Sequence, residues 1–234
     1  MPTTQEIEYA VLANAAYRDT RNELQNAPVI PAGWTRLSRT ALGFSEGPSP
    51  SGFSAEAFQK GTDIVISYQG TNSDPFTKDG YRDWGSNIAN YLGWASNQMK
   101  EAALFYQRVK AQNPNATNIT FTGHSLGGGL AGLMSIFFDR PAVVFDSAPF
   151  QGSASAQNAR LLRDYLAAQA TSDAHSGGRA KKSLHRSCSM RARRRKRAAQ
   201  NHTRHRPEKR MDWTFPAIDG RRLAHTNVFQ RRVK

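Results

Sequence analysis

The feature that most constrains the fold is a Gly-x-Ser-x-Gly motif at residues 123–127, centred on Ser125. Residues 118–122 before it are mostly β-branched or aromatic, which is typical of a buried strand. Residues 130–138 after it are apolar and long enough for a buried helix. This context predicts a nucleophile elbow, a strained turn that holds the serine hydroxyl above the end of a sheet. Glycine suits both flanks because a Cβ there would collide with the adjacent strand and helix.

The elbow predicts two site residues. Ser125 is expected to act as a nucleophile, and the N–H of Leu126, at the start of the helix, is expected to point toward a developing oxyanion. The alternative is a plain glycine-rich turn in which Ser125 only caps the helix. A further apolar strand at residues 142–146, after the helix-breaking Pro141, favours the elbow, because strand, elbow, helix and strand then follow in the required order.

Charge is distributed unevenly along the 234 residues. Residues 1–170 hold 13 Lys and Arg against 14 Asp and Glu, whereas residues 171–234 hold 19 against 4, so the net charge of +14 belongs to the second part. This contrast predicts one folded domain over residues 1–170 and a basic, disordered tail over residues 171–234. The single cysteine, Cys188, excludes an internal disulfide.

Targeting and cofactor signals are missing from the sequence. No apolar run reaches the ~18 residues of a membrane span. Residues 1–6 have neither the positive start nor the apolar stretch of a secretory signal. We therefore expect a cytoplasmic protein or one exported by a non-classical route, with no metal and no cofactor.

Apolar patterning predicts strands alternating with helices. A helix capped by Thr3 or Thr4 is expected to run to about Tyr17, a hairpin to cover residues 53–69, and a last helix to lie near residues 154–169. This order favours an α/β fold whose parallel or mixed sheet has helices on both faces. A short strand is expected near Trp34–Leu37, and a helix before the elbow strand is expected to bury Met99, Ala102, Ala103, Tyr106 and Val109.

Four segments carry a family resemblance. Residues 123–128 read Gly-His-Ser-Leu-Gly-Gly, residues 13–17 read Ala-Asn-Ala-Ala-Tyr, residues 67–71 read Ser-Tyr-Gln-Gly-Thr, and residues 83–87 read Asp-Trp-Gly-Ser-Asn. Together they resemble the class 3 lipase family of the α/β-hydrolases over residues 1–170. The resemblance implies a mostly parallel α/β-hydrolase sheet with flanking helices.

The resemblance also implies a function. The chain would cleave lipid or other carboxylic esters, as a triacylglycerol lipase, phospholipase or esterase does, through an acyl-enzyme on Ser125. Thr71 takes the place of the family's oxyanion residue and would act beside Leu126. His124 would be a packing or hydrogen-bonding residue rather than the base. The implied partners are a lipid or small ester substrate and a lipid interface.

Two positions depart from the family pattern. Gln69 stands where arginine is usual, and Asp146 stands where the family has glycine. Asp146 is itself a candidate catalytic acid, the alternative being a simple cap at a strand end. Four aromatic residues are candidates for an acyl pocket or lid, or alternatively for the core: Phe76, Tyr81, Trp84 and Trp94.

A serine elbow needs a base and an orienting acid, which in this family follow in the order Ser, Asp or Glu, His. The family pattern ends after Ala170, with no convincing later strand, so the sheet is expected to be incomplete at its C-terminal end. Asp219 and His225 fit the order best among the downstream residues, because apolar side chains surround them in the sequence.

Two interpretations of residues 171–234 remain open. In the first, the segment is a basic appendage that binds nucleic acid or an anionic membrane, so that the protein is a polyanion-binding module. In the second, it results from a reading-frame shift, and the chain is a catalytically incompetent relative of the hydrolases. The loss of the family pattern fits the second interpretation better.

Overall fold

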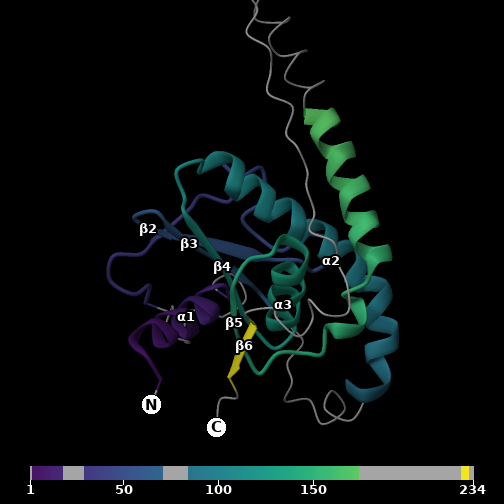
Figure 1. The fold of residues 1–234 in the computed structure, drawn as a ribbon, viewed down its shortest axis with the longest axis horizontal. Helices are drawn as coiled ribbons and strands as arrows, with labels where there is room; N and C mark the ends of the chain where they lie inside the picture. Colours follow the sequence, from purple (N-terminus) through teal and green to yellow (C-terminus); the bar gives the residue numbers. More distant parts are fainter. Residues whose placement is uncertain (1, 18–28, 71–83, 174–227, 232–234) are drawn as a thin grey trace, which may run out of the picture. The chain divides into compact units, whose positions relative to one another are not determined.

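The fold is taken from a computed structural model, which divides into two compact units, Met1–Leu162 with Phe215–Lys234, and Arg163–Thr214. The described part of the second unit is residues 163–173, which are helical. The structure describes residues 2–17, 29–70, 84–173 and 228–231, with backbone alone for residues 84–96 and 228–231 (Figure 1).

Six strands form one mixed sheet, and their order in the sheet is their order in the chain (Figure 1). The first three pair antiparallel, and the last four, counting β3 in both groups, pair parallel. The expected α/β class with a mostly parallel sheet is therefore confirmed. The strands are β1 (Thr35–Arg36), β2 (Ala55–Lys60), β3 (Asp63–Tyr68), β4 (Asn118–His124), β5 (Ala142–Phe145) and β6 (Val228–Arg231).

Strand β6 corrects the sequence analysis, which found no convincing strand after residue 170. It pairs with β5 in parallel, from Ala142 opposite Val228 to Phe145 opposite Arg231. Four residues in an arginine-rich context carry little strand signal of their own, because β-propensity depends mainly on the neighbouring strand. Residues 171–173, the start of the expected tail, are helical, and the rest of the tail lies outside the described residues.

Strand β3 brings the chain to the elbow. Every β3 residue after Asp63 is buried, as its continuous apolar run predicts. Its register with β4 places Tyr68 opposite Gly123, the first glycine of the motif. The end of β3 and the start of the elbow therefore lie side by side at one end of the sheet.

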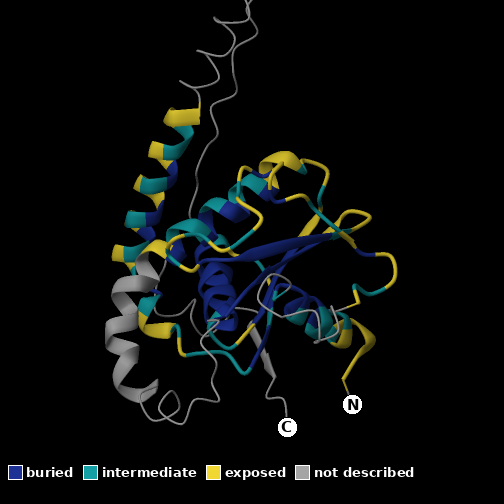
Figure 2. Ribbon diagram, turned by 180° about the vertical axis from the view of Figure 1, so that it is seen from behind, coloured by how far each residue is buried: buried dark blue, intermediate teal, exposed yellow. Residues whose placement is uncertain are grey.

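Helix α2 (Trp84–Gln112) and helix α3 (Leu126–Phe138) cover one face of the sheet. Tyr106 of α2 packs edge-on against Phe121 of β4, with ring centroids 5.3 Å apart, and lies 4.4 Å from the ring of Phe138 in α3. Figure 2 shows that the buried residues concentrate in the strands and in α3. All five residues expected in the core of α2 are buried: Met99, Ala102, Ala103, Tyr106 and Val109.

Helix α1 (Thr4–Ala15) covers the opposite face of the sheet. Its Leu12 belongs to a buried cluster with Phe58, Val65 and Phe145. These three strand residues face α1, because successive side chains of a strand point to opposite faces and their neighbours face α2. The expected cap at Thr3 is confirmed, because its hydroxyl accepts from the Glu6 N–H while the Glu6 carboxylate accepts from the Thr3 N–H. The helix ends at Ala15, so Tyr17 lies just beyond it.

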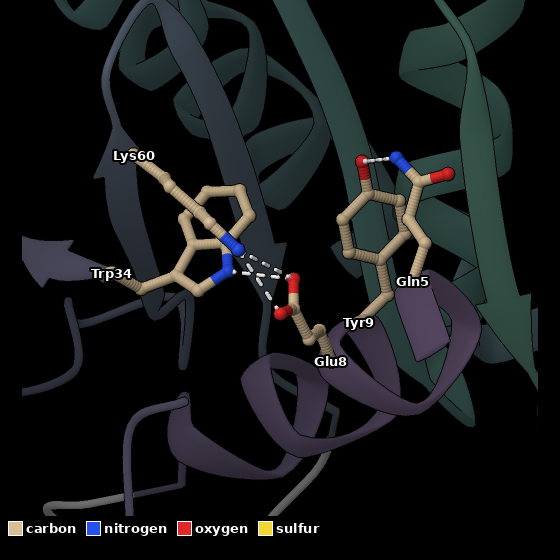
Figure 3. Close-up of polar contacts among 5 residues, drawn as sticks. All are labelled: Gln5, Glu8, Tyr9, Trp34 and Lys60. Carbon is tan, nitrogen blue, oxygen red and sulfur yellow. Dashed lines mark hydrogen bonds and ion pairs between the residues drawn. The ribbon is translucent and has the colours of Figure 1, made fainter. Parts of the chain in front are cut away.

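A polar cluster ties α1 to the antiparallel part of the sheet (Figure 3). The indole N–H of Trp34 donates to Glu8 Oε2 at 2.9 Å, and Lys60 Nζ lies 3.1 Å from Glu8 Oε1. The same ammonium lies 5.6 Å from the centre of the Trp34 ring, within cation–π range. These hydrogen bonds, from Trp34 first and Lys60 second, lower the pKa of the Glu8 carboxyl.

This cluster predicts a pH-dependent contribution to stability. Because the pKa of Glu8 is lower in the folded chain than the ordinary 4.5, its stabilisation is present above pH 4.5 and is lost as the pH falls through the folded value. Glu8→Gln should therefore lower the free energy of unfolding at pH 7, by about 1 kcal/mol or less, and make little difference at pH 3. Urea unfolding at both pH values measures this. Asp164→Asn, which removes an exposed carboxylate from the helix over residues 156–173, is the control, and an equal effect of Glu8→Gln at both pH values would refute the prediction.

Candidate active site

Ser125 forms the whole turn between β4 and α3. Its backbone has φ 54° and ψ −121°, a conformation that residues with a side chain rarely adopt. Three hydrogen bonds hold it there: the Ser125 N–H donates to the Phe145 carbonyl, and the Ser125 carbonyl accepts from the N–H groups of Gly129 and Ala148, at 2.8–3.1 Å. The side chain is half-buried. The expected strand–elbow–helix is therefore present, with the serine in a strained turn.

The two motif glycines are required by close backbone contact. A Cβ on Gly127 would lie 2.0 Å from the Tyr68 carbonyl oxygen, and a Cβ on Gly123 would lie 2.5 Å from the Gly127 carbonyl group. No real Cβ approaches so closely, and neither neighbour is a side chain that can rotate away. The steric explanation offered from the sequence is confirmed, and α3 rests directly on the end of β3.

The N–H of Leu126, the expected oxyanion donor, lies at the N-terminus of α3. As the first residue of α3, Leu126 has no acceptor within the helix for its N–H, and the helix dipole adds positive potential at this end. The chain leaving β3 passes beside it, because a Cβ on Gly70 would lie 3.5 Å from Leu126 N. Thr71, the expected second donor, follows at once but lies outside the described residues.

Asp146 follows β5 with φ 42°, in the left-handed region. This explains the glycine that the family pattern has here, because glycine adopts positive φ without strain. Aspartate is one of the few other residues that tolerate it. The position therefore keeps the backbone geometry of the pattern and adds a half-buried carboxylate near the elbow, since the preceding residue, Phe145, accepts the Ser125 N–H.

The remaining predicted residues fall in three groups. His124 is exposed, which disfavours packing and leaves the suggested hydrogen-bonding role as a prediction. Trp84 and Trp94 both lie in α2, in the part of that helix for which the structure describes the backbone alone. The other candidates lie outside the described residues: Thr71, Phe76, Tyr81, Asp219 and His225.

Tyr68 and Gln69, just before the site, are fixed in the core. The Tyr68 hydroxyl donates to the Ala102 carbonyl at 3.1 Å, and burial raises the pKa of this phenol well above its usual value, so Tyr68 stays neutral. Gln69, which replaces the family's arginine, is buried, and its backbone N–H donates to the Ser54 carbonyl. Both residues hold the end of β3 in place.

Sequence reasoning missed one residue at the site, Tyr17. Its hydroxyl accepts a hydrogen bond from the Gly70 N–H at 2.9 Å and lies 3.4 Å from the His124 carbonyl. The only signal in the sequence was that Tyr17 closes one of the segments that carry the family resemblance. Its partner is 53 residues away, and no local pattern reports such a pairing.

Among the helices that the structure describes, none combines the length and the apolar character needed to cross a bilayer. Within the same part of the chain, no three His, Cys, Asp or Glu side chains gather as they do around a metal ion.

Comparison with known proteins matched the chain to a family, to a relative and to solved structures. Residues 8–175 match the family described as Phospholipase-like: Tle-like phospholipase domain. The extracellular phospholipase A1 of Serratia liquefaciens is 34% identical over 153 residues, which are 63% of this chain and 44% of that protein. The chain thus spans less than half the length of this relative. Among solved structures, lipase II from Rhizopus niveus is similar over 61% of each chain, with 15% identity and a TM-score of 0.34.

Proposed function

Because the chain belongs to the Tle-like phospholipase domain family, we propose that it hydrolyses carboxylic esters of lipids through an acyl-enzyme on Ser125. The observation that supports this most strongly is the elbow itself. Ser125 has φ 54° and is held by three backbone hydrogen bonds. Strain of this kind costs of order 1–3 kcal/mol, and strained residues cluster at active sites.

The reaction has two steps. Ser125 Oγ attacks the ester carbonyl and loses its proton to a base, and the alcohol leaves with a proton, so that the acyl group stays on the serine. Water then attacks the acyl-serine, the carboxylic acid leaves, and the serine regains its proton. In both steps the N–H groups of Leu126 and Thr71 stabilise the negative oxygen. One such donor contributes about 2.7–4 kcal/mol in comparable sites.

We also propose a base and an acid for Ser125. Chain order assigns them to His225 and Asp219, with Asp146 as the alternative acid because it follows the strand beside the elbow. The start of β6 at Val228 pairs with Ala142, at the opposite end of β5 from the elbow. A role for His225 therefore requires that the chain before Val228 return toward Ser125.

We propose phospholipids as the substrate class, presented at a lipid interface. The support is the description of the family and the name of the Serratia relative, an extracellular phospholipase A1. The same name supports export of this chain from the cell. A polyanion-binding tail has no comparable support, because residues 174–227 lie outside the described part of the chain.

The acyl-enzyme can be tested by competition between water and methanol. Phenyl and p-nitrophenyl esters of one acid should give the same ratio of methyl ester to free acid, because both pass through the same acyl-Ser125. The whole chain is incubated with each ester at a fixed methanol concentration, and the products are separated by chromatography. A ratio that changes with the leaving alcohol would mean that water attacks the ester directly.

A further inference from the structure

The Tyr17 hydroxyl lies between Gly70, which follows β3, and His124, the last residue of β4. It accepts the Gly70 N–H at 2.9 Å, a normal hydrogen bond, and lies a longer 3.4 Å from the His124 carbonyl. Gly70 immediately precedes Thr71, and His124 immediately precedes Ser125. One side chain at the end of α1 thus contacts both strand ends from which the site is built.

Gly70 lies tightly against both the hydroxyl and the elbow. A Cβ on Gly70 would lie 2.6 Å from Tyr17 Oη, 3.0 Å from the His124 carbonyl oxygen and 3.5 Å from Leu126 N. Gly70 is itself buried, so its N–H needs an acceptor within the protein, which Tyr17 provides. The hydroxyl therefore holds Gly70 in its position beside the Leu126 amide.

We propose that Tyr17 is a positioning residue for the oxyanion site. By accepting the Gly70 N–H and contacting the His124 carbonyl, it holds Gly70, the residue before the expected donor Thr71, beside the N–H of Leu126. The inference rests on the proposed function for its catalytic consequence. The hydrogen bond itself is a property of the fold and can be measured without any turnover.

Removing the hydroxyl should act on the transition state more than on substrate binding. In Tyr17→Phe the buried Gly70 N–H loses this acceptor, and the segment shifts or admits water to satisfy it. Oxyanion donors are effective only when already aimed at the negative oxygen, which exists in the transition state and not in the bound ester. A displaced donor therefore lowers kcat and leaves KM almost unchanged.

Tyr9→Phe is the matched control. Tyr9 lies in α1, whereas Tyr17 lies just beyond the end of that helix. The Tyr9 hydroxyl is also hydrogen-bonded, but it accepts from Gln5 Nε2 of the same helix (Figure 3). With p-nitrophenyl butyrate, Tyr17→Phe should lower kcat about 10-fold, less than the ~10²–10³ for deleting a donor outright, with KM within about twofold. Tyr9→Phe should change neither. An unchanged kcat in Tyr17→Phe would overturn the proposal.

Amide exchange at Gly70 is the second readout. Hydrogen exchange followed by NMR should be faster at Gly70 in Tyr17→Phe and unchanged there in Tyr9→Phe, with β3 and β4 equally protected in all three proteins. Unchanged exchange at Gly70 would overturn the proposal even if kcat fell. Parallel assays of Ser125→Ala separate failure of the proposed function from failure of the Tyr17 proposal. If Ser125→Ala turns over as fast as the wild type, the proposed function fails. Gly70 exchange then still decides whether Tyr17 holds this segment.

Discussion

Ser125→Ala should remove the ester hydrolysis catalysed by this chain. Alanine has no Oγ to form the acyl-enzyme, and what remains is the contribution of binding and of the oxyanion donors. Where base and acid are in place, loss of a nucleophilic serine costs about 10⁶-fold in kcat. Initial rates with p-nitrophenyl butyrate at saturating concentration measure the effect.

The control for this substitution is Ser45→Ala. Ser45 is exposed in the loop before β2, and its hydroxyl donates to the Gly47 carbonyl at 3.0 Å. This variant should keep the wild-type rate. Full turnover by Ser125→Ala would mean that the hydrolysis comes from another group. That group would not be a second elbow serine of the described residues, which contain no other serine in a strained turn between strand and helix.

Gly127→Ala should destabilise the fold more than any ordinary surface substitution. The added Cβ would lie 2.0 Å from the Tyr68 carbonyl oxygen and 2.7 Å from its carbon, both in the backbone of a buried strand. Relief requires α3 to move away from β3, which opens the core. Overpacking of this severity costs about 3 kcal/mol or more, and urea unfolding monitored by tryptophan fluorescence measures it.

Gly152→Ala provides the comparison for that loss. A Cβ on Gly152 has no atom within 4 Å, and this glycine does not have positive φ. The substitution should therefore be neutral, or stabilising by less than ~1 kcal/mol through a less flexible unfolded chain. Equal stability of Gly127→Ala and Gly152→Ala would show that α3 does not rest on the end of β3 as described.

The parts of the fold that the sequence predicts well are those governed by neighbouring residues. The cap at Thr3 depends on a side chain three residues away, and the hairpin of β2 and β3 on a short glycine turn. The elbow likewise depends on contacts within one strand–turn–helix unit, with Ser125 at its centre. Each of these can be deduced from residue types at fixed short spacing.

The parts that the sequence does not reveal depend on contacts between distant segments. Strand β6 is a strand because β5 is there to pair with it, and its own four residues have no clear pattern. The contacts of Tyr17 with Gly70, and of Glu8 with Trp34 and Lys60, join segments that only the folded chain brings together. The candidate site was therefore predictable at Ser125 and Leu126, whereas the contact of α1 with the site was not.

Covalent labelling shows whether Ser125 is the nucleophile. The whole chain is treated with a fluorophosphonate ester, and the modified peptide is sequenced by mass spectrometry. We predict one adduct per chain, on Ser125, and no adduct in Ser125→Ala. Labelling on another residue, or an intact folded chain that no fluorophosphonate modifies, would mean that Ser125 is not the nucleophile.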